Sequence, residues 1–334
     1  MRALRLARPG PIATRPLRLA ERPPPVPGPG ELRVRIEVCG VCRTDLHLVE
    51  GDLAPRHESV TPGHQAVGRV DALGPGVGGP PIGTRVGIAW LHRACGACRF
   101  CARGDENLCL APRFTGWDVD GGFAELAVAA VPFVYELPEA LAPEQAAPLL
   151  CAGIIGYRAF RRSGAGAGAR LGLWGFGASA HIAIQVARHA GCQVYVFSRA
   201  GVHGALAREL GAAWVGGSLD EPPVPLDAAI LFAPAGELVP VALERLDRGG
   251  TLAVAGIHLT DVPPLAYQRH LFQERTLTSV TANTRADGRA LLALAAGIPI
   301  RSRVRCYPLE AANEALADLK HDRIRGAAAL DLRA

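Results

Sequence analysis

Four cysteines lie close together in the chain, in the pattern C-x2-C-x2-C-x7-C. They are Cys95, Cys98, Cys101 and Cys109. Gaps of two residues let successive thiolates turn back onto one ion, and four thiolates form the closed tetrahedral ligand set of a structural zinc site. Spacing alone does not identify the metal, so an iron–sulfur cluster is the alternative. We predict a structural zinc ion whose binding stabilises this loop.

A glycine-rich turn, GFGASA (175–180), follows the apolar run LGLW (171–174) and opens a helical pattern. Gly175 permits a tight turn, Gly177 lets the backbone approach a pyrophosphate, and Ala180 takes the small third position that allows close helix packing. The sequence therefore predicts a dinucleotide-binding site. The residues expected to contact the cofactor in this turn are Gly175, Gly177, Ala178 and Ser179.

The residues that select between the two nicotinamide cofactors are expected about 20 positions after this turn. The chain has Ser198 and Arg199 there, and no Asp or Glu. A carboxylate would bind a free ribose 2′-hydroxyl and repel a 2′-phosphate, whereas a hydroxyl and a guanidinium can bind the phosphate. The sequence favours NADP(H) over NAD(H). The alternative is that Arg199 faces solvent and the backbone alone binds the cofactor.

Three further segments carry side chains that bind metals or transfer protons: CGVCRTDLH (39–47), PGHQ (62–65) and CAG (151–153). With the cysteine cluster, the glycine-rich turn and the tail IRGAAALDL (324–332), their order resembles that of the zinc-dependent alcohol dehydrogenases. These enzymes belong to the medium-chain dehydrogenase/reductase superfamily. The resemblance covers the whole chain.

By this resemblance, Cys42, His64 and Cys151 hold a second, catalytic zinc ion, with the fourth position left open for water or substrate. Asp45 is expected to orient the histidine ligand. Many relatives have Glu after that histidine, where this chain has Gln65. A neutral amide cannot act as an anionic transient ligand. The resemblance thus implies two zinc ions per chain and no exchange of ligands through Gln65.

The resemblance also implies roles for residues around the zinc. Thr44 and His47 match a relay that carries the alcohol proton to solvent, although His47 alone would pass for a surface histidine. Arg43 matches a residue near the cofactor pyrophosphate. Trp90 and Trp117 match positions that line the substrate pocket, and core aromatic residues are the alternative.

Together these features predict reversible hydride transfer between a nicotinamide cofactor and a primary or secondary alcohol, or its aldehyde or ketone, with zinc as the Lewis acid. One alternative is a quinone or enoyl reductase of the same superfamily, but such relatives lack both sets of zinc ligands. The other is a sensor protein that binds NADP(H) and zinc without turnover, for which Gln65 is the only indication.

The elements that position these residues change in character along the chain. Short strand patterns separated by Gly and Pro fill the first 140 residues and indicate a β-barrel. After Pro143, helical patterns alternate with single apolar strands, which is typical of a doubly wound parallel sheet. By the resemblance, residues 1–152 and 287–334 form a GroES-like catalytic domain, and residues 153–286 form a Rossmann domain.

Composition limits the other possibilities. A chain of 334 residues is about twice the usual size of one domain. The net charge of +5 is small and the arginines are spread along the chain, so no nucleic-acid partner is expected. No signal peptide or membrane-spanning segment is predicted. Nine cysteines, an odd number, favour metal binding in a reducing compartment, and we expect a cytoplasmic protein.

An oligomer is expected as well. The run TLTSV (276–280) reads as a possible edge strand of the nucleotide-binding sheet, and pairing it across a two-fold axis would cover that edge. The resemblance implies a homodimer or a homotetramer.

Overall fold

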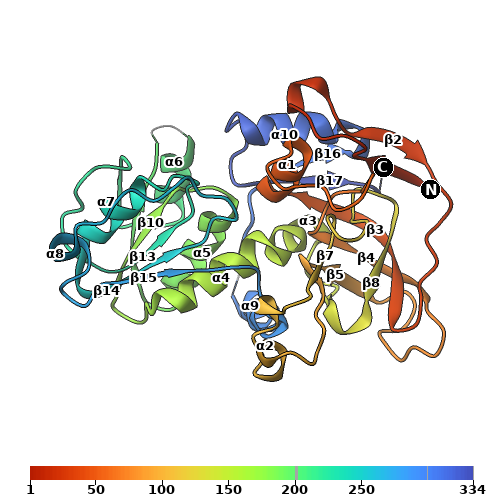
Figure 1. Ribbon diagram of the computed structural model, residues 1–334, viewed down its shortest axis with the longest axis horizontal. Coiled ribbons are helices and arrows are strands. Elements are labelled where there is room, and N and C mark those ends of the chain that lie inside the picture. Colours follow the sequence, from red (N-terminus) through yellow and green to blue (C-terminus); the bar gives the residue numbers. More distant parts are fainter. Residues whose placement is uncertain (200–201, 299, 334) are drawn as a thin grey trace. The chain divides into compact units, whose positions relative to one another are not determined.

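The chain folds into two compact units, seen in the computed structural model (Figure 1). The structure describes residues 1–199, 202–298 and 300–333. The first unit comprises Met1–Cys151, Ala282–Gly297 and Arg303–Ala334, and the second comprises Ala152–Thr281 and Ile298–Ser302. The chain passes from one unit to the other at 151/152, 281/282, 297/298 and 302/303. The domain limits expected from the sequence, 152/153 and 286/287, stay a prediction.

The second unit is built on a parallel sheet. Among the described residues this sheet has six strands in the order β12-β11-β10-β13-β14-β15. In that order the strands are Trp214–Gly216, Gln193–Phe197, Arg170–Trp174, Leu226–Leu231, Leu246–Val254 and Thr276–Ser279. The order reverses between β10 and β13, and ligands of such sheets bind beyond the carboxyl ends of the strands at that point. The predicted doubly wound sheet is confirmed.

Apolar runs explain the central strands of this sheet. The side chains of Leu171, Leu173 and Val196 are inaccessible to solvent, because helices cover both faces of a parallel sheet. The helices are α4 (Ala152–Ser163), α5 (Ala178–His189), α6 (Val202–Glu209), α7 (Leu238–Glu244) and α8 (Tyr267–His270). Within the described residues, no helix is both long and apolar enough to cross a lipid bilayer.

The first unit contains a mostly antiparallel sheet, in which the described strands follow the order β16-β17-β3-β4-β5-β9 and β8 also pairs with β3. Alternate residues of β3, Leu32, Val34 and Ile36, are buried in the core, as the period of a strand requires. The strands are β3 (Glu31–Val41), β4 (Ala66–Leu73), β5 (Arg85–Ile88), β8 (Leu126–Ala130), β9 (Val134–Glu136), β16 (Val304–Pro308) and β17 (Ala327–Asp331).

The end of the chain completes this sheet. Strand β17 lies antiparallel to β3, with Ala328 opposite Val41, and β16 lies parallel to β17. Two small hairpins flank the sheet: β1 (Arg2–Arg5) with β2 (Arg18–Glu21), and β6 (Leu91–Arg93) with β7 (Arg113–Phe114). The helices are α1 (Arg43–Glu50), α2 (Arg99–Ala102), α3 (Pro143–Ala146), α9 (Arg285–Gly297) and α10 (Ala312–Lys320).

Candidate active site and metal centres

The four clustered cysteines converge in the loop that joins β6 to β7. Their four sulfur atoms lie within 4.8 Å of one another. The sulfur of Cys101 is 3.6 Å from that of Cys98 and 3.9 Å from that of Cys95. Helix α2 separates Cys98 from Cys101 by about one turn, so both sulfurs face the same point. The structure therefore brings the predicted ligand set together.

Backbone amides surround these sulfurs with hydrogen-bond donors. The amide of Cys95 donates to the sulfur of Cys109 at 3.2 Å, and the amide of Cys98 donates to the sulfur of Cys95 at 3.4 Å. Hydrogen bonds from the amides of Cys101 and Leu110 lower the pKa of the Cys98 thiol to about 6. Because such donors favour the thiolate, the form that binds zinc, the cluster fits a structural zinc ion.

A second group of metal-binding side chains comes from three parts of the first unit. Cys42 lies between β3 and α1, His64 lies just before β4, and Cys151 ends the first long segment of the unit. One sulfur or ring nitrogen from each residue lies within 4.8 Å of the others. Three ligands leave a fourth tetrahedral position open, as in catalytic zinc sites.

The buried carboxylate of Asp45 orients this group. One oxygen accepts the amide of Cys42 at 2.9 Å, and the other lies 3.1 Å from both the amide of Gly63 and Nδ1 of His64. A carboxylate only accepts hydrogen bonds, so Nδ1 carries a proton, and in the neutral ring Nε2 offers its lone pair. Nε2 of His64 is buried without a hydrogen-bond partner among the described residues. An acceptor left in this way is costly unless it binds a metal, so the group fits zinc.

The pKa values of Cys42 and His64 in the metal-free site also fit a zinc site. The neighbouring Cys151 thiol and the positive charge of His64 hold the pKa of Cys42 well below its usual value despite burial. Burial alone would lower the pKa of His64, but Asp45 and Cys42 raise it to about 10. Zinc binds a neutral imidazole, so loading the site with zinc must release the His64 proton.

Helix α1 carries the expected relay residues. The Thr44 hydroxyl is buried and lies 3.7 Å from the Cys42 sulfur. His47 follows one turn later on the same face of the helix. Nδ1 of His47 lies 2.8 Å from a carboxylate oxygen of Asp52, a contact that the sequence reasoning missed. Gly51, a typical residue at a helix end, was the available signal that the chain turns back there.

Arg43 and Gln65, which were expected near the cofactor and the zinc ion, contact other residues of the first unit. The Arg43 guanidinium donates to Asp322 at 3.0 Å and to the carbonyl of Leu319 at 3.4 Å. Its predicted place near a pyrophosphate stays a prediction. Gln65 is buried against β3, where a Cβ added at Gly40 would lie 3.0 Å from its side chain. Gln65 therefore fills space between the strands.

Stacked aromatic rings stand beside the histidine ligand. The Trp90 ring meets the His64 ring edge-on at 4.9 Å between centroids. Trp90 also stacks on Phe114 at 4.8 Å and on Trp117 at 6.0 Å, and the Arg56 guanidinium lies 3.7 Å from the centroid of Trp117. Phe114 was missed because nothing in its local sequence marks it. Contact of these rings with substrate stays a prediction.

The glycine-rich turn in the second unit has the expected backbone. Gly175 adopts a left-handed conformation, with φ 85°, and a Cβ there would lie 2.9 Å from the amide of Ala233. Gly177 precedes α5, and a Cβ there would meet no protein atom within 4 Å, so the backbone is open to an approaching pyrophosphate. Ala180 is fully buried.

The predicted cofactor-selecting residues stand at the end of β11. Ser198 is buried and its amide donates to the carbonyl of Gly216 at 3.0 Å. Arg199 is exposed. The residues that follow, 200 and 201, lie outside the described part of the chain. The choice of cofactor stays a prediction.

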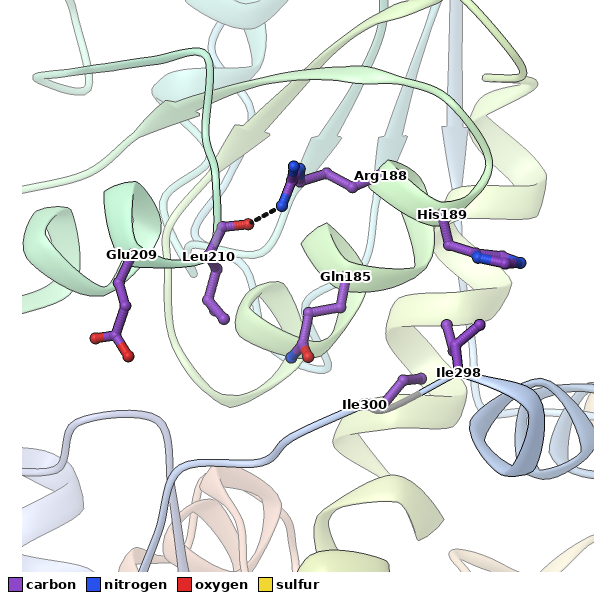
Figure 2. A pocket seen from close by; sticks show the side chains of 7 residues that line it. All are labelled: Gln185, Arg188, His189, Glu209, Leu210, Ile298 and Ile300. Atoms are coloured by element: carbon purple, nitrogen blue, oxygen red, sulfur yellow. Dashed lines mark hydrogen bonds between the residues drawn. The ribbon is translucent and has the colours of Figure 1, made fainter.

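An open hollow of about 410 Å³ lies elsewhere on the second unit, near the ends of α5 and α6 (Figure 2). Arg188 at its rim donates to the carbonyl of Leu210 at 3.0 Å. No residue predicted to bind cofactor or metal lines it. Its lining residues are Gln185, Arg188, His189, Glu209, Leu210, Ile298 and Ile300.

Two protein families match the chain. Residues 28–139 match the family described as the alcohol dehydrogenase GroES-like domain, and residues 180–297 match the family of zinc-binding dehydrogenases. The fold class expected from the sequence, a GroES-like domain with a Rossmann domain, is confirmed by these matches and by the six-stranded sheet described above.

Individual relatives extend over almost the whole chain. A probable alcohol dehydrogenase, AdhA, of Mycobacterium tuberculosis (strain CDC 1551 / Oshkosh) is 53% identical and covers 99% of this chain and 97% of its own length. An alcohol dehydrogenase of Geobacillus stearothermophilus is 36% identical over 91% of this chain and 92% of its own. The structure of a thermostable alcohol dehydrogenase from Pyrobaculum aerophilum, with cobalt and zinc bound, matches 99% of both chains with a TM-score of 0.91 at 26% identity.

Proposed function

The chain belongs to the zinc-dependent alcohol dehydrogenases of the medium-chain superfamily, and from that premise we propose which residues perform the oxidation and with which cofactor. We propose that it interconverts a primary or secondary alcohol and its aldehyde or ketone with NADP(H), at a zinc ion held by Cys42, His64 and Cys151. The observation that carries the proposal is the convergence of these three side chains, with His64 Nε2 buried and without a partner.

Hydrogen bonds fix the ligands of the proposed catalytic zinc site in place. Asp45 holds the His64 ring so that Nε2 faces the two sulfurs, and its bonds to the amides of Cys42 and Gly63 fix the two ligand-bearing segments to each other. The bound zinc ion supplies a Lewis acid that polarises the substrate oxygen. The second zinc, held by the four clustered cysteines, stabilises its loop, because helix α2 of that loop has no buried residue.

The alcohol proton leaves along α1 in this proposal. Thr44 lies beside a ligand sulfur, so its hydroxyl can accept a hydrogen bond from the substrate hydroxyl and pass a proton on. His47 receives that proton on a ring nitrogen and releases it to solvent. Oxidation thus gives one carbonyl product, one hydride on the nicotinamide and one proton in solvent.

The second unit would hold the cofactor. The open backbone at Gly177, the turn at Gly175 and the start of α5 support a pyrophosphate site that includes Ala178 and Ser179. Ser198 and Arg199 support a preference for NADP(H), because neither repels a 2′-phosphate. The nicotinamide supplies or takes up the hydride.

We also propose a homodimer or a homotetramer. Strand β15 is the last strand of its sheet, and its Leu277 is 38% exposed. Nearby in sequence, the exposed rings of Tyr267 and Phe272 meet edge-on at 5.8 Å. An exposed strand edge beside apolar side chains is a surface that a second copy can cover. The cytoplasmic location expected from the sequence stays a prediction.

The test of the proposal replaces one catalytic ligand, as Cys42→Ser. We expect the purified variant to lose about one of two zinc ions per chain, measured by elemental analysis. Turnover of NADPH with a panel of aldehydes should fall by roughly three orders of magnitude, since the Lewis acid contributes several kcal/mol. Binding of NADPH, measured by fluorescence, should remain.

The matched control is Cys306→Ser, which changes an exposed cysteine outside both ligand sets. It should keep two zinc ions and full turnover. Undiminished turnover in Cys42→Ser would contradict the ligand assignment. Native protein that binds two zinc ions and NADPH but turns over none of the substrates would instead favour a sensor.

A further inference from the structure

A line of polar side chains runs from the metal ligands to the surface along α1. Thr44, whose hydroxyl lies beside Cys42, is 6% exposed as a whole residue. The side chain of His47 is 13% exposed and that of Asp52 is 49% exposed. Exposure therefore rises step by step from the metal site to solvent. Asp52 is the outermost member of this line, and the proposed function gives it no role.

The end of α1 brings Asp52 back onto the helix. Gly51 ends the helix in a left-handed conformation, with φ 95°, which disfavours other residues. The amides of Gly51 and Leu53 both donate to the carbonyl of His47, at 3.0 and 3.2 Å. Two bonds to one carbonyl fold the chain tightly over His47. The Asp52 carboxylate is thereby placed 2.8 Å from Nδ1 of that ring.

The chemistry of this contact determines which ring nitrogen can accept a proton. A carboxylate only accepts hydrogen bonds, so in neutral His47 the proton must be on Nδ1 and the lone pair on Nε2. We propose that Asp52 is a positioning residue for the reaction, which holds His47 in the Nδ1–H tautomer so that Nε2 receives the alcohol proton. The inference rests on the proposed relay through Thr44 and His47.

The other charged groups around α1 are engaged elsewhere. Glu50 accepts two hydrogen bonds from Lys320 of α10, at 2.7 and 2.9 Å, and one from the amide of Ile12. Arg43 pairs with Asp322, which follows α10. Asp52 is therefore the carboxylate that acts on His47, and neither Glu50 nor Asp322 is placed to replace it.

The test compares Asp52→Asn with Asp52→Glu in the zinc-loaded protein. An asparagine side chain can either accept from Nδ1 or donate to it, so it no longer fixes the ring proton on Nδ1. Nitrogen-15 NMR of ring-labelled histidine should therefore show His47 as a mixture of both tautomers, with its signals assigned by His47→Gln. We expect kcat for alcohol oxidation to fall about tenfold to a hundredfold, less than the roughly hundredfold to ten-thousandfold that a general base itself contributes, because Asp52 acts only through His47. Zinc content should not change, and Asp52→Glu should restore most of the rate.

The control is Glu58→Gln, which neutralises an exposed carboxylate of the same loop. It should leave both the tautomer and the rate unchanged. If Asp52→Asn leaves tautomer and rate unaltered while His47→Gln slows oxidation, the relay stands and the role of Asp52 is overturned. If His47→Gln also has no effect on the rate, the relay itself is wrong and the inference falls with it.

Discussion

The residue with the clearest consequence for the choice of cofactor is Ser198. It is buried at the carboxyl end of β11, where a new side chain would meet the ribose of a bound dinucleotide. Replacement by Asp introduces a carboxylate that repels a 2′-phosphate and can bind a 2′-hydroxyl. We expect kcat/KM for NADP to fall at least about tenfold in Ser198→Asp, which corresponds to about 1.4 kcal/mol.

NAD serves as the internal control, because it lacks the phosphate. Its kcat/KM should change little or rise, and both values come from the same purified variant with the same alcohol. A native enzyme that prefers NAD, or a variant in which both cofactors lose equally, would contradict the assignment of Ser198 as a selector.

Spacing predicted the cysteine cluster, because its four members follow a fixed local pattern, whereas the resemblance predicted the second group, whose members lie far apart in the sequence. All four clustered cysteines come from one loop, and Cys42, His64 and Cys151 converge as expected. Asp52 and Phe114 were missed for a physical reason. Their neighbours lie on other turns or loops, so only the folded chain shows that one touches His47 and the other Trp90.

At the scale of elements, buried strands were the most predictable feature. The run QVYVF coincides with β11, because a central parallel strand is apolar on both faces. Strand β14, in contrast, begins at Leu246, five residues before the apolar run TLAVAG. After Leu246 the next four residues are polar or glycine, and the pairing of β14 with β13 shifts register between Leu226 and Ala228. Strands β6, β7 and β9 are too short to show a period.

One contact links the cysteine-rich loop to helix α9. Glu106 of the loop is buried and accepts the amide of Arg285 at 2.9 Å and its guanidinium at 3.0 Å. It therefore satisfies a donor at the first turn of α9. Burial alone would raise the pKa of Glu106, but these bonds outweigh burial and leave it below its usual value.

The sign of the resulting pH dependence follows from linkage. A carboxyl whose pKa is lower in the folded protein stabilises the fold above its unfolded pKa, about 4.3 for Glu, and stops doing so as pH falls through the folded value. We expect Glu106→Gln to lower the free energy of unfolding of the first unit by about 1.5–3 kcal/mol at pH 7. The difference from the native protein should shrink as pH falls below about 4.3 and vanish once pH lies below the folded pKa of Glu106.

Hydrogen exchange at the first turn of α9 measures this effect locally, and denaturant unfolding measures it globally. Glu136→Gln, which neutralises an exposed carboxylate of the same unit, is the control and should change neither. If Glu106→Gln were as stable as the native protein at pH 7, the buried contact would contribute nothing to the attachment of the loop.

At the scale of the whole molecule, the path of the chain explains why the tail matters for the metal site. Strand β3 leads directly to Cys42, and its neighbour in the sheet is β17, near the end of the chain. Ala329 pairs with Gly40 across the two strands. The resemblance predicted that the tail belongs to the first domain, but nothing in one sequence identifies the partner of a strand so far away.

The proposed oligomer would form through the sheet of the second unit. Strand β15 ends that sheet, and a two-fold axis beside it would bring Leu277 of one copy close to the same residue of the other. Leu277→Lys would then place two like charges in a desolvated contact, at a cost of a few kcal/mol or about a hundredfold in the dissociation constant. Light scattering after size exclusion should find a dimer or tetramer for the native chain and a smaller species for Leu277→Lys.

Leu219→Lys, at a more exposed leucine outside β15, is the control and should leave the native mass unchanged. A native monomer, or the same loss of mass in both variants, would rule out β15 as the interface.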